Sequence, residues 1–378
     1  MFHSARAVVG VLAVVTALCA GLPVAAQAQP AWYPGLLLAA QPVGGDWGGL
    51  DDVQRIEYVT TGPGGELVPA QALVRLPDGD PPPGGRPVVA WDHGTSGLGG
   101  QCGLMGSEWL KEDTAPTLSR LNDAGYAVVA PDYIGLSPGS PGPHPYLQTS
   151  TEATATIDAV RAARAASADL SASWAVAGSS QGGHAALGTG HLAPDYAPEL
   201  DFRGTAALAP ATNLETIFLR ARPDQPEMPG YPGHAVAMVL AGMTGTNPGV
   251  DIRDYLTPAG QRFIADLATG CSARTGAMLA TADIGELFSR PLDDPQFAPV
   301  LREYMGTPVS GYQDPVLLVH GFTDTTVPLP LTLTLIGQLV EHGTLPEVQF
   351  LDAGHDDLRD RGGLDRALAF LGRVLPPR

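Results

Sequence analysis

The chain has 378 residues, 44% of them hydrophobic, which allows one large domain with an insertion or two small domains. Its formal net charge of −18 argues against nucleic acid or an anionic membrane surface as a main partner, because both repel an acidic protein. The 47 glycines and 36 prolines are spread along the chain, so they indicate many structured turns rather than a disordered tract.

Residues 1–28 have the pattern of a secretory signal peptide. Arg6 supplies the positive charge, an apolar stretch follows over 7–20, and an A-x-A cleavage site ends at Ala28. This stretch is short for a membrane anchor, so we expect no stable membrane insertion. A lipoprotein is disfavoured, because Cys19 follows a leucine where a lipobox requires a small residue. We therefore expect a protein that is secreted to the periplasm or the medium.

Removal of the leader leaves two cysteines, Cys102 and Cys271. Two cysteines in an exported chain predict one disulfide, and the alternative is a pair of free buried thiols. The sequence has no CxxC pair, no HExxH and no cluster of His, Cys and Asp at ligand spacing, so it gives no support for a metal site.

The remaining pattern predicts strands and helices that alternate along most of the chain. Residues 29–52, rich in Gly and Pro, are expected to wrap the outside of the domain. Strands are predicted at 55–60, 68–75, 87–91, 126–130, 174–177, 202–209, 315–319 and 348–351. Helices are predicted at 117–122, 150–166, 183–187, 329–342 and 364–374. Thr149, with Glu152 three residues later, fits a capping box. Continuous apolar strands between helices indicate an α/β fold, a mostly parallel sheet with helices on both faces.

The alternation breaks down between Ala209 and Pro315. We expect residues 211–311 to form an inserted helical cap over the strand ends, where open α/β sheets place their ligand sites. The core would then comprise residues 29–210 and 312–378. The apolar run 234–243 could line an acyl tunnel or form an ordinary buried cap helix, and it is too short to span a bilayer.

Ser180 lies at the centre of Gly178-Ser179-Ser180-Gln181-Gly182, directly after a predicted strand and before a predicted helix. That context is typical of the nucleophile elbow of α/β-hydrolases. The flanking glycines leave room for a strained serine and for a helix packed close to the strand. The motif alone also occurs by chance, so the prediction depends on finding an acid, a base and an oxyanion site nearby.

A serine hydroxyl needs a base to remove its proton and an acid to orient that base. In this fold the chain order is serine, acid, histidine. Asp324 follows the strand 315–319, and His355 follows the last strand. We therefore predict Ser180, Asp324 and His355 as the catalytic residues. Asp352 is the competing acid, but it lies only three residues before His355, which makes the required loop-to-loop geometry awkward.

The oxyanion that forms on attack needs preorganised donors. We expect one to be the backbone N–H of Gln181, which follows the nucleophile. The second is expected in the loop Asp92–Gly97, from the Thr95 or Gly94 amide, although an ordinary glycine turn would explain this loop almost as well.

Several motifs together resemble the secretory lipase family of α/β-hydrolases, including its bacterial members. The similar segments are Trp91–Thr95, Pro131–Leu136, His144–Leu147, Asp158–Ala162, Gly178–Ala186 and His320–Pro328. The resemblance covers roughly residues 87–357 and only loosely the cap. Ser137 stands where another glycine would be expected. The resemblance implies hydrolysis of carboxylic esters, often acylglycerols, without a cofactor, and it supports the same three catalytic residues.

The sequence thus predicts a secreted serine hydrolase that cleaves esters with an apolar acyl group. It leaves lipase and general carboxylesterase open, as well as the oligomeric state. The alternatives are a serine peptidase or aminopeptidase on the same fold, an acyltransferase, and a binding protein that has kept the scaffold without catalysis.

Overall fold

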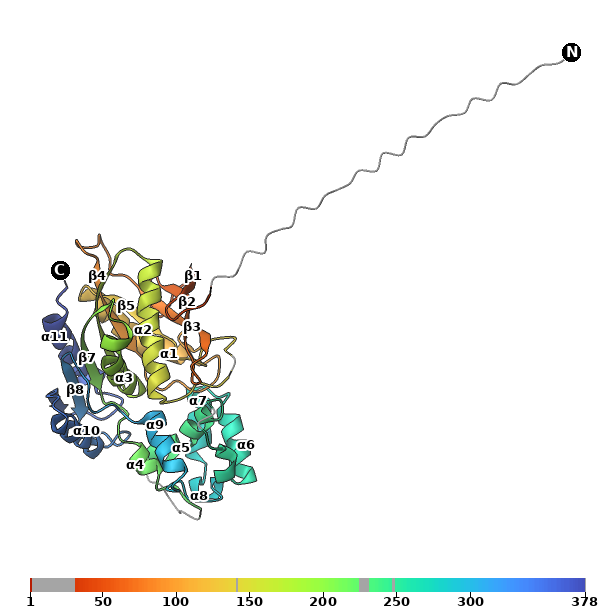
Figure 1. Ribbon diagram of the computed structural model, residues 1–378. Helices are drawn as coiled ribbons and strands as arrows, with labels where there is room; N and C mark the ends of the chain where they lie inside the picture. The colour runs from red at the N-terminus through yellow and green to blue at the C-terminus, as the bar shows by residue number, and fades with distance from the viewer. Residues whose placement is uncertain (2–30, 141, 224–230, 247–248, 378) are drawn as a thin grey trace. The chain divides into compact units, whose positions relative to one another are not determined.

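Nine strands form a single sheet that organises the chain (Figure 1). The computed structural model describes Met1 and residues 31–140, 142–223, 231–246 and 249–377. Apart from Met1, the predicted signal peptide lies outside the described residues. All the elements below belong to one compact unit that begins at Trp32.

The strand order is β1-β2-β3-β5-β4-β6-β7-β8-β9. The strands are β1 (Leu37–Pro42), β2 (Gln54–Thr61), β3 (Leu67–Arg75), β4 (Arg86–Asp92), β5 (Ala127–Pro131), β6 (Leu170–Ser179), β7 (Asp201–Leu208), β8 (Val316–Gly321) and β9 (Glu347–Leu351). Pairing is antiparallel from β1 to β5 and parallel from β5 through β4 to β9. The mostly parallel sheet predicted from the sequence is therefore confirmed.

Residues 29–52 do more than wrap the outside of the domain, because they include strand β1. This strand pairs with β2 at the edge of the sheet and is largely exposed. An exposed edge strand needs no alternating apolar face, which explains why its sequence carries no strand signal. In the same stretch, Trp47 is buried and its indole N–H donates to the Leu104 carbonyl, 3.2 Å away.

Alternate residues of each core strand point to opposite faces, and each face carries its own helices. Val89, Val128 and Ala175 pack against α1 (Glu108–Asp123) and α11 (Leu364–Val374). Val88, Val129 and Trp174 face α2 (Thr149–Ala166) and α3 (Gln181–Tyr196). A smaller cluster joins β7 and β8 to α10 (Leu329–Glu341) on the same face as α3. Both faces of the sheet are thus covered, as the continuous apolar strands predict.

Three helices begin at other residues than predicted. α3 runs from Gln181 to Tyr196, so the predicted 183–187 is only part of it. α1 begins at Glu108, with the Ser107 side chain accepting from the Leu110 N–H, so the predicted 117–122 is only its second half. Pro116 lies inside this helix, where a proline is unusual because it cannot donate a backbone hydrogen bond. The capping box at Thr149 is wrong: Gln148 is the N-cap, and Glu152 points into the interior instead.

Between β7 and β8, the described residues form helices and no strand. They are α4 (Glu215–Phe218), α5 (Tyr231–Met243), η1 (Ile252–Tyr255), α6 (Pro258–Leu267), α7 (Ser272–Ala280), α8 (Ile284–Leu287) and α9 (Phe297–Met305). Figure 1 shows these helices gathered in one group, and they share a single apolar cluster. We propose that this group is the cap, residues 211–311. No helix in the described part of the chain is long and apolar enough to cross a membrane.

Cys102 and Cys271 form a disulfide that connects the core to the cap segment. Beside it, Gly97 pairs with Cys271 in an isolated bridge, and the Leu98 N–H donates to Gly270 O at 2.9 Å. The two backbones approach so closely that a Cβ on Gly97, whose φ is +126°, would overlap Gly270 and Cys271. The disulfide thus reinforces a contact that is also made by backbone pairing.

Removing this cross-link should destabilise the protein. The bond spans 169 residues, and closing so long a loop constrains the unfolded chain strongly. We expect the C102S/C271S variant to lose about 2–5 kcal/mol of unfolding free energy. Urea unfolding followed by circular dichroism measures this loss, and a midpoint equal to that of the oxidised wild type would contradict it.

Candidate active site

The predicted site residues lie on loops that follow strands β4, β6, β8 and β9. Thr95 follows β4, Ser180 follows β6, Asp324 follows β8 and His355 follows β9. The carboxyl ends of parallel strands meet at one edge of the sheet. In the sheet, β5 lies on one side of β4 and β6 on the other, so the direction in which strands are added reverses at β4. Open α/β sheets place their ligand sites at such a reversal.

Ser180 occupies a sharp turn between β6 and α3, with φ 61° and ψ −119°. Behind it, helix and strand are in close contact: a Cβ on Gly182 would overlap the Asp92 carbonyl oxygen, and a Cβ on Gly178 would overlap Gly182. Only glycine fits at these two positions. The turn is the strained elbow that the motif predicts, and it aims the Ser180 hydroxyl away from the sheet.

Three predicted side chains are in mutual contact. Nε2 of His355 lies 2.8 Å from Oγ of Ser180, and its Nδ1 lies 2.7 Å from Oδ2 of Asp324. A carboxylate only accepts hydrogen bonds, so the Nδ1–H of His355 donates to Asp324. The lone pair of Nε2 then faces the Ser180 hydroxyl, which donates to it. This tautomer is the one that can take the serine proton.

Asp324 is held in place by its own loop. Its Oδ1 accepts from the backbone N–H groups of Thr326 and Val327, at 2.9 and 2.8 Å. Nε2 of His320 lies 3.4 Å from its Oδ2 and donates to Val327 O at 2.9 Å. Burial lowers the pKa of His320, so this ring is a neutral part of the turn. The competing acid, Asp352, is exposed.

The oxyanion candidates lie on two sides of Ser180. Gln181 is the first residue of α3, so its N–H has no carbonyl partner within the helix. In the loop after β4, Thr95 and Gly94 line the same cleft as Ser180. The Thr95 hydroxyl is 2.9 Å from the hydroxyl of Tyr146. His93 is buried, and burial lowers its pKa to about 4, so its neutral ring belongs to the loop structure.

A cleft of about 570 Å³ opens above Ser180 and His355. Met238 and Leu279, from α5 and α7, give it an apolar wall. A polar rim is formed by the Asp113–Arg359 ion pair. The exposed ring of Trp109, at the start of α1, lies at the same rim. The cap segment and the core therefore build this cleft together.

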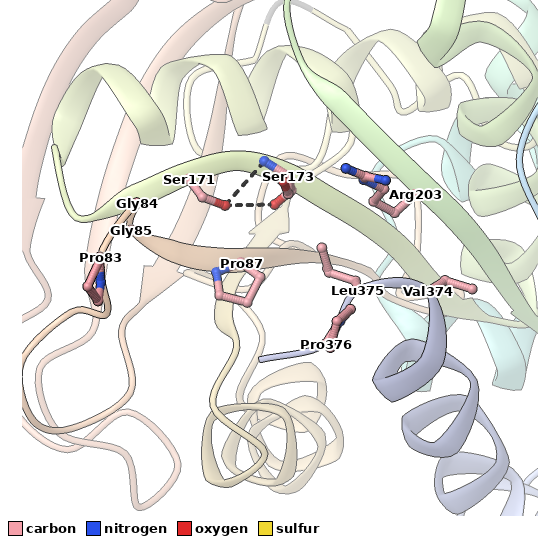
Figure 2. A pocket seen from close by; sticks show the side chains of 10 residues that line it. All are labelled: Pro83, Gly84, Gly85, Pro87, Ser171, Ser173, Arg203, Val374, Leu375 and Pro376. Atoms are coloured by element: carbon pink, nitrogen blue, oxygen red, sulfur yellow. Dashed lines mark hydrogen bonds between the residues drawn. The ribbon is translucent and has the colours of Figure 1, made fainter. Parts of the chain in front are cut away.

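A second hollow, of about 250 Å³, lies at the opposite edge of the sheet (Figure 2). Pro87, Ser171 and Arg203 lie near the amino ends of β4, β6 and β7 and line it with Val374 to Pro376. The Ser171 hydroxyl is 3.1 Å from the Ser173 carbonyl oxygen, to which it donates. This hollow is remote from Ser180 and contains no base next to a hydroxyl.

Sequence reasoning missed a buried cluster below the elbow. Glu152 contacts Gln181 and His184, and Gln181 also contacts His144. All four side chains are buried. The sequence signal for this cluster was a glutamate on the apolar face of α2, but Glu152 was interpreted as part of a capping box instead. Among the described residues, no group of three His, Cys, Asp or Glu could hold a metal ion.

Comparisons with known proteins bear on the family and the fold of the chain. The secretory lipase family model matches residues 111–345, more than half of the chain. A rice cell wall degrading esterase, LipA from Xanthomonas oryzae, is 22% identical with a TM-score of 0.69 over 91% of this chain and 98% of its own. Candida antarctica lipase A is 19% identical with a TM-score of 0.70, over 89% and 83%.

At these identities the two structures establish the α/β-hydrolase fold alone. Comparison with curated protein sequences finds no match. The family match adds the kind of enzyme, which the fold alone does not give. With the predicted fold confirmed, the chain belongs to the secretory lipase family and is a carboxylic ester hydrolase.

Proposed function

We propose that the protein is a secreted serine esterase that works through an acyl-enzyme on Ser180. The observation that carries this proposal is the continuous chain of hydrogen bonds from Ser180 Oγ through His355 to Asp324, 2.8 and 2.7 Å long. Such a chain supplies a nucleophile, its base and the group that orients the base.

In the first half-reaction His355 Nε2 takes the proton of Ser180 as Oγ attacks the ester carbonyl carbon. The tetrahedral intermediate carries a negative oxygen. It collapses when the bond to the alcohol oxygen breaks and His355 returns its proton to that oxygen. In the second half-reaction a water molecule loses its proton to His355 and attacks the acyl carbon. Collapse then breaks the bond between the acyl carbon and Oγ, His355 returns its proton to Oγ, and the acid is released with Ser180 restored. Asp324 stabilises the imidazolium in both halves.

The negative oxygen of each intermediate would be held by the backbone N–H of Gln181 and by the Thr95 amide. The Gln181 N–H also lies at the amino end of α3, a 16-residue helix whose dipole favours negative charge there. Removal of one such donor typically costs roughly 100- to 1,000-fold in rate.

The apolar wall of Met238 and Leu279 supports an ester with an apolar acyl group as substrate. The leader pattern of residues 1–28 and the Cys102–Cys271 disulfide support export, since disulfides persist in oxidising compartments.

Single alanine substitutions of Ser180, Asp324 and His355 should each lower kcat/KM by at least about a thousandfold, because they remove the nucleophile, the group that orients and stabilises the imidazolium, and the base, respectively. The assay is hydrolysis of a soluble p-nitrophenyl ester. Asp352→Ala is the matched control, and its rate should stay within about twofold of the wild type, as for a surface change. If Asp324→Ala retained activity while Asp352→Ala lost it, the assigned acid would be wrong.

Leu279→Trp should make the cleft narrower at its apolar wall, so that the enzyme prefers esters with shorter acyl chains. A cleft of 570 Å³ is of the size that encloses a small ligand, so one larger side chain changes the space substantially. We expect the ratio of octanoate to acetate hydrolysis to fall by about tenfold, the effect of losing one or two methylene contacts.

The matched control for this test is Ala280→Trp, on the exposed side of the same helix. Its octanoate-to-acetate ratio should equal that of the wild type. An unchanged ratio in Leu279→Trp, or an equal fall in both variants, would show that this wall does not hold the acyl group.

A further inference from the structure

Glu152 is a fully buried carboxylate on α2, directly below the Ser180 turn. Its Oε1 accepts from the Gln181 side-chain amide at 2.7 Å and from the Leu147 N–H at 3.2 Å. Its Oε2 accepts from Nδ1 of His184 at 2.8 Å. Both oxygens are therefore occupied, and both bind side chains of the first turn of α3.

The orientation of the Gln181 amide follows from its two neighbours. Nδ1 of His144 is 2.9 Å from Ile134 O, which only accepts, so Nδ1 carries the proton. Burial lowers the pKa of His144 to about 3, which leaves its Nε2 unprotonated. The Gln181 amide nitrogen lies 2.6 Å from that Nε2 and 2.7 Å from Glu152. Both amide protons are thus donated to fixed acceptors.

His184 is held as an imidazolium. One of its N–H groups donates to Glu152, and Nε2 lies 3.1 Å from Met305 O, which only accepts. Burial disfavours the charged ring, but the hydrogen bond and charge of Glu152, together with the Met305 carbonyl, favour it, and the pKa of His184 is raised. Nε2 also lies 3.1 Å from the Thr149 hydroxyl, which donates to Gly306 O. This ion pair therefore connects α2 and α3 to the end of α9 in the cap.

We propose that Glu152 is a positioning residue for ester hydrolysis: through Gln181 and His184 it fixes the first turn of α3, so that the Gln181 backbone N–H stays aimed at the oxyanion. The proposal rests on the proposed serine mechanism. Glu152 itself lies below the turn and reaches the reacting atoms only through Gln181. Because an oxyanion donor acts on the intermediate more than on the bound ester, its misplacement lowers kcat and leaves KM nearly unchanged.

Glu152→Gln tests this role with a side chain of the same size. The glutamine can no longer accept from both Gln181 and His184, because its NH2 group faces one of these donors. We expect kcat for a soluble p-nitrophenyl ester to fall about 10- to 100-fold, part of the loss that follows removal of a donor, with KM within about twofold.

Asp158→Asn is the matched control. Asp158 is a second fully buried carboxylate on α2, but its partners are Thr60, Tyr196 and Arg161, away from Ser180. Its replacement should lower the melting temperature yet leave kcat within about twofold, as expected for a site outside the reaction. Equal changes of kcat in the two variants, or a change of KM alone in Glu152→Gln, would overturn the positioning role.

Gln181→Met serves if Glu152→Gln does not fold. It keeps the backbone N–H and the side-chain length but removes the anchored amide, so kcat should again fall at constant KM; an unchanged kcat would overturn the proposal.

Labelling of the wild type with a fluorophosphonate separates the serine mechanism from the positioning role of Glu152. No label on Ser180 overturns the serine mechanism, whereas a labelled wild type with fully active Glu152→Gln and Gln181→Met overturns only the positioning role.

Discussion

The close approach of α3 to the end of β4 is the constraint on which the site depends. The Gly182 backbone lies against the Asp92 carbonyl, and Ser180 makes the turn between strand and helix at φ 61°. That turn directs the hydroxyl toward His355 and leaves the Gln181 N–H free at the start of the helix. The local strain is sustained because strand and helix are both buried in the core.

Two connections between core and cap lie on either side of this turn. The disulfide and the Gly97–Cys271 bridge hold the loop that contains Thr95. On the other side, His184 connects the first turn of α3 to Met305 at the end of α9. Each segment proposed to stabilise the oxyanion is therefore tied to the cap segment that also forms the apolar wall. The proposed acyl-binding wall and the proposed oxyanion donors are thus held by the same connections between core and cap segment.

The sheet, its flanking helices and the three side chains at its edge were predictable from the sequence. Buried parallel strands are continuous apolar runs, and the loops that follow them meet at one edge of the sheet, so the contact among Ser180, Asp324 and His355 could be predicted from their positions. Strand β1 and the start of α1 were missed, because an exposed edge strand and a proline-containing helix lack the usual patterns. Glu152 was wrongly assigned to a helix capping box, because the residues it contacts, Gln181 and His184, are distant in sequence and only the fold brings them together.

Trapping the acyl group on the enzyme would test the proposed serine mechanism directly. The enzyme would be mixed with excess p-nitrophenyl ester, quenched in acid within milliseconds, digested and mapped by mass spectrometry. We predict an added acyl mass on the peptide that contains Ser180, and no such mass in the Ser180→Ala variant. Turnover of the ester with that peptide unmodified throughout, or with the acyl group on another residue, would contradict this mechanism.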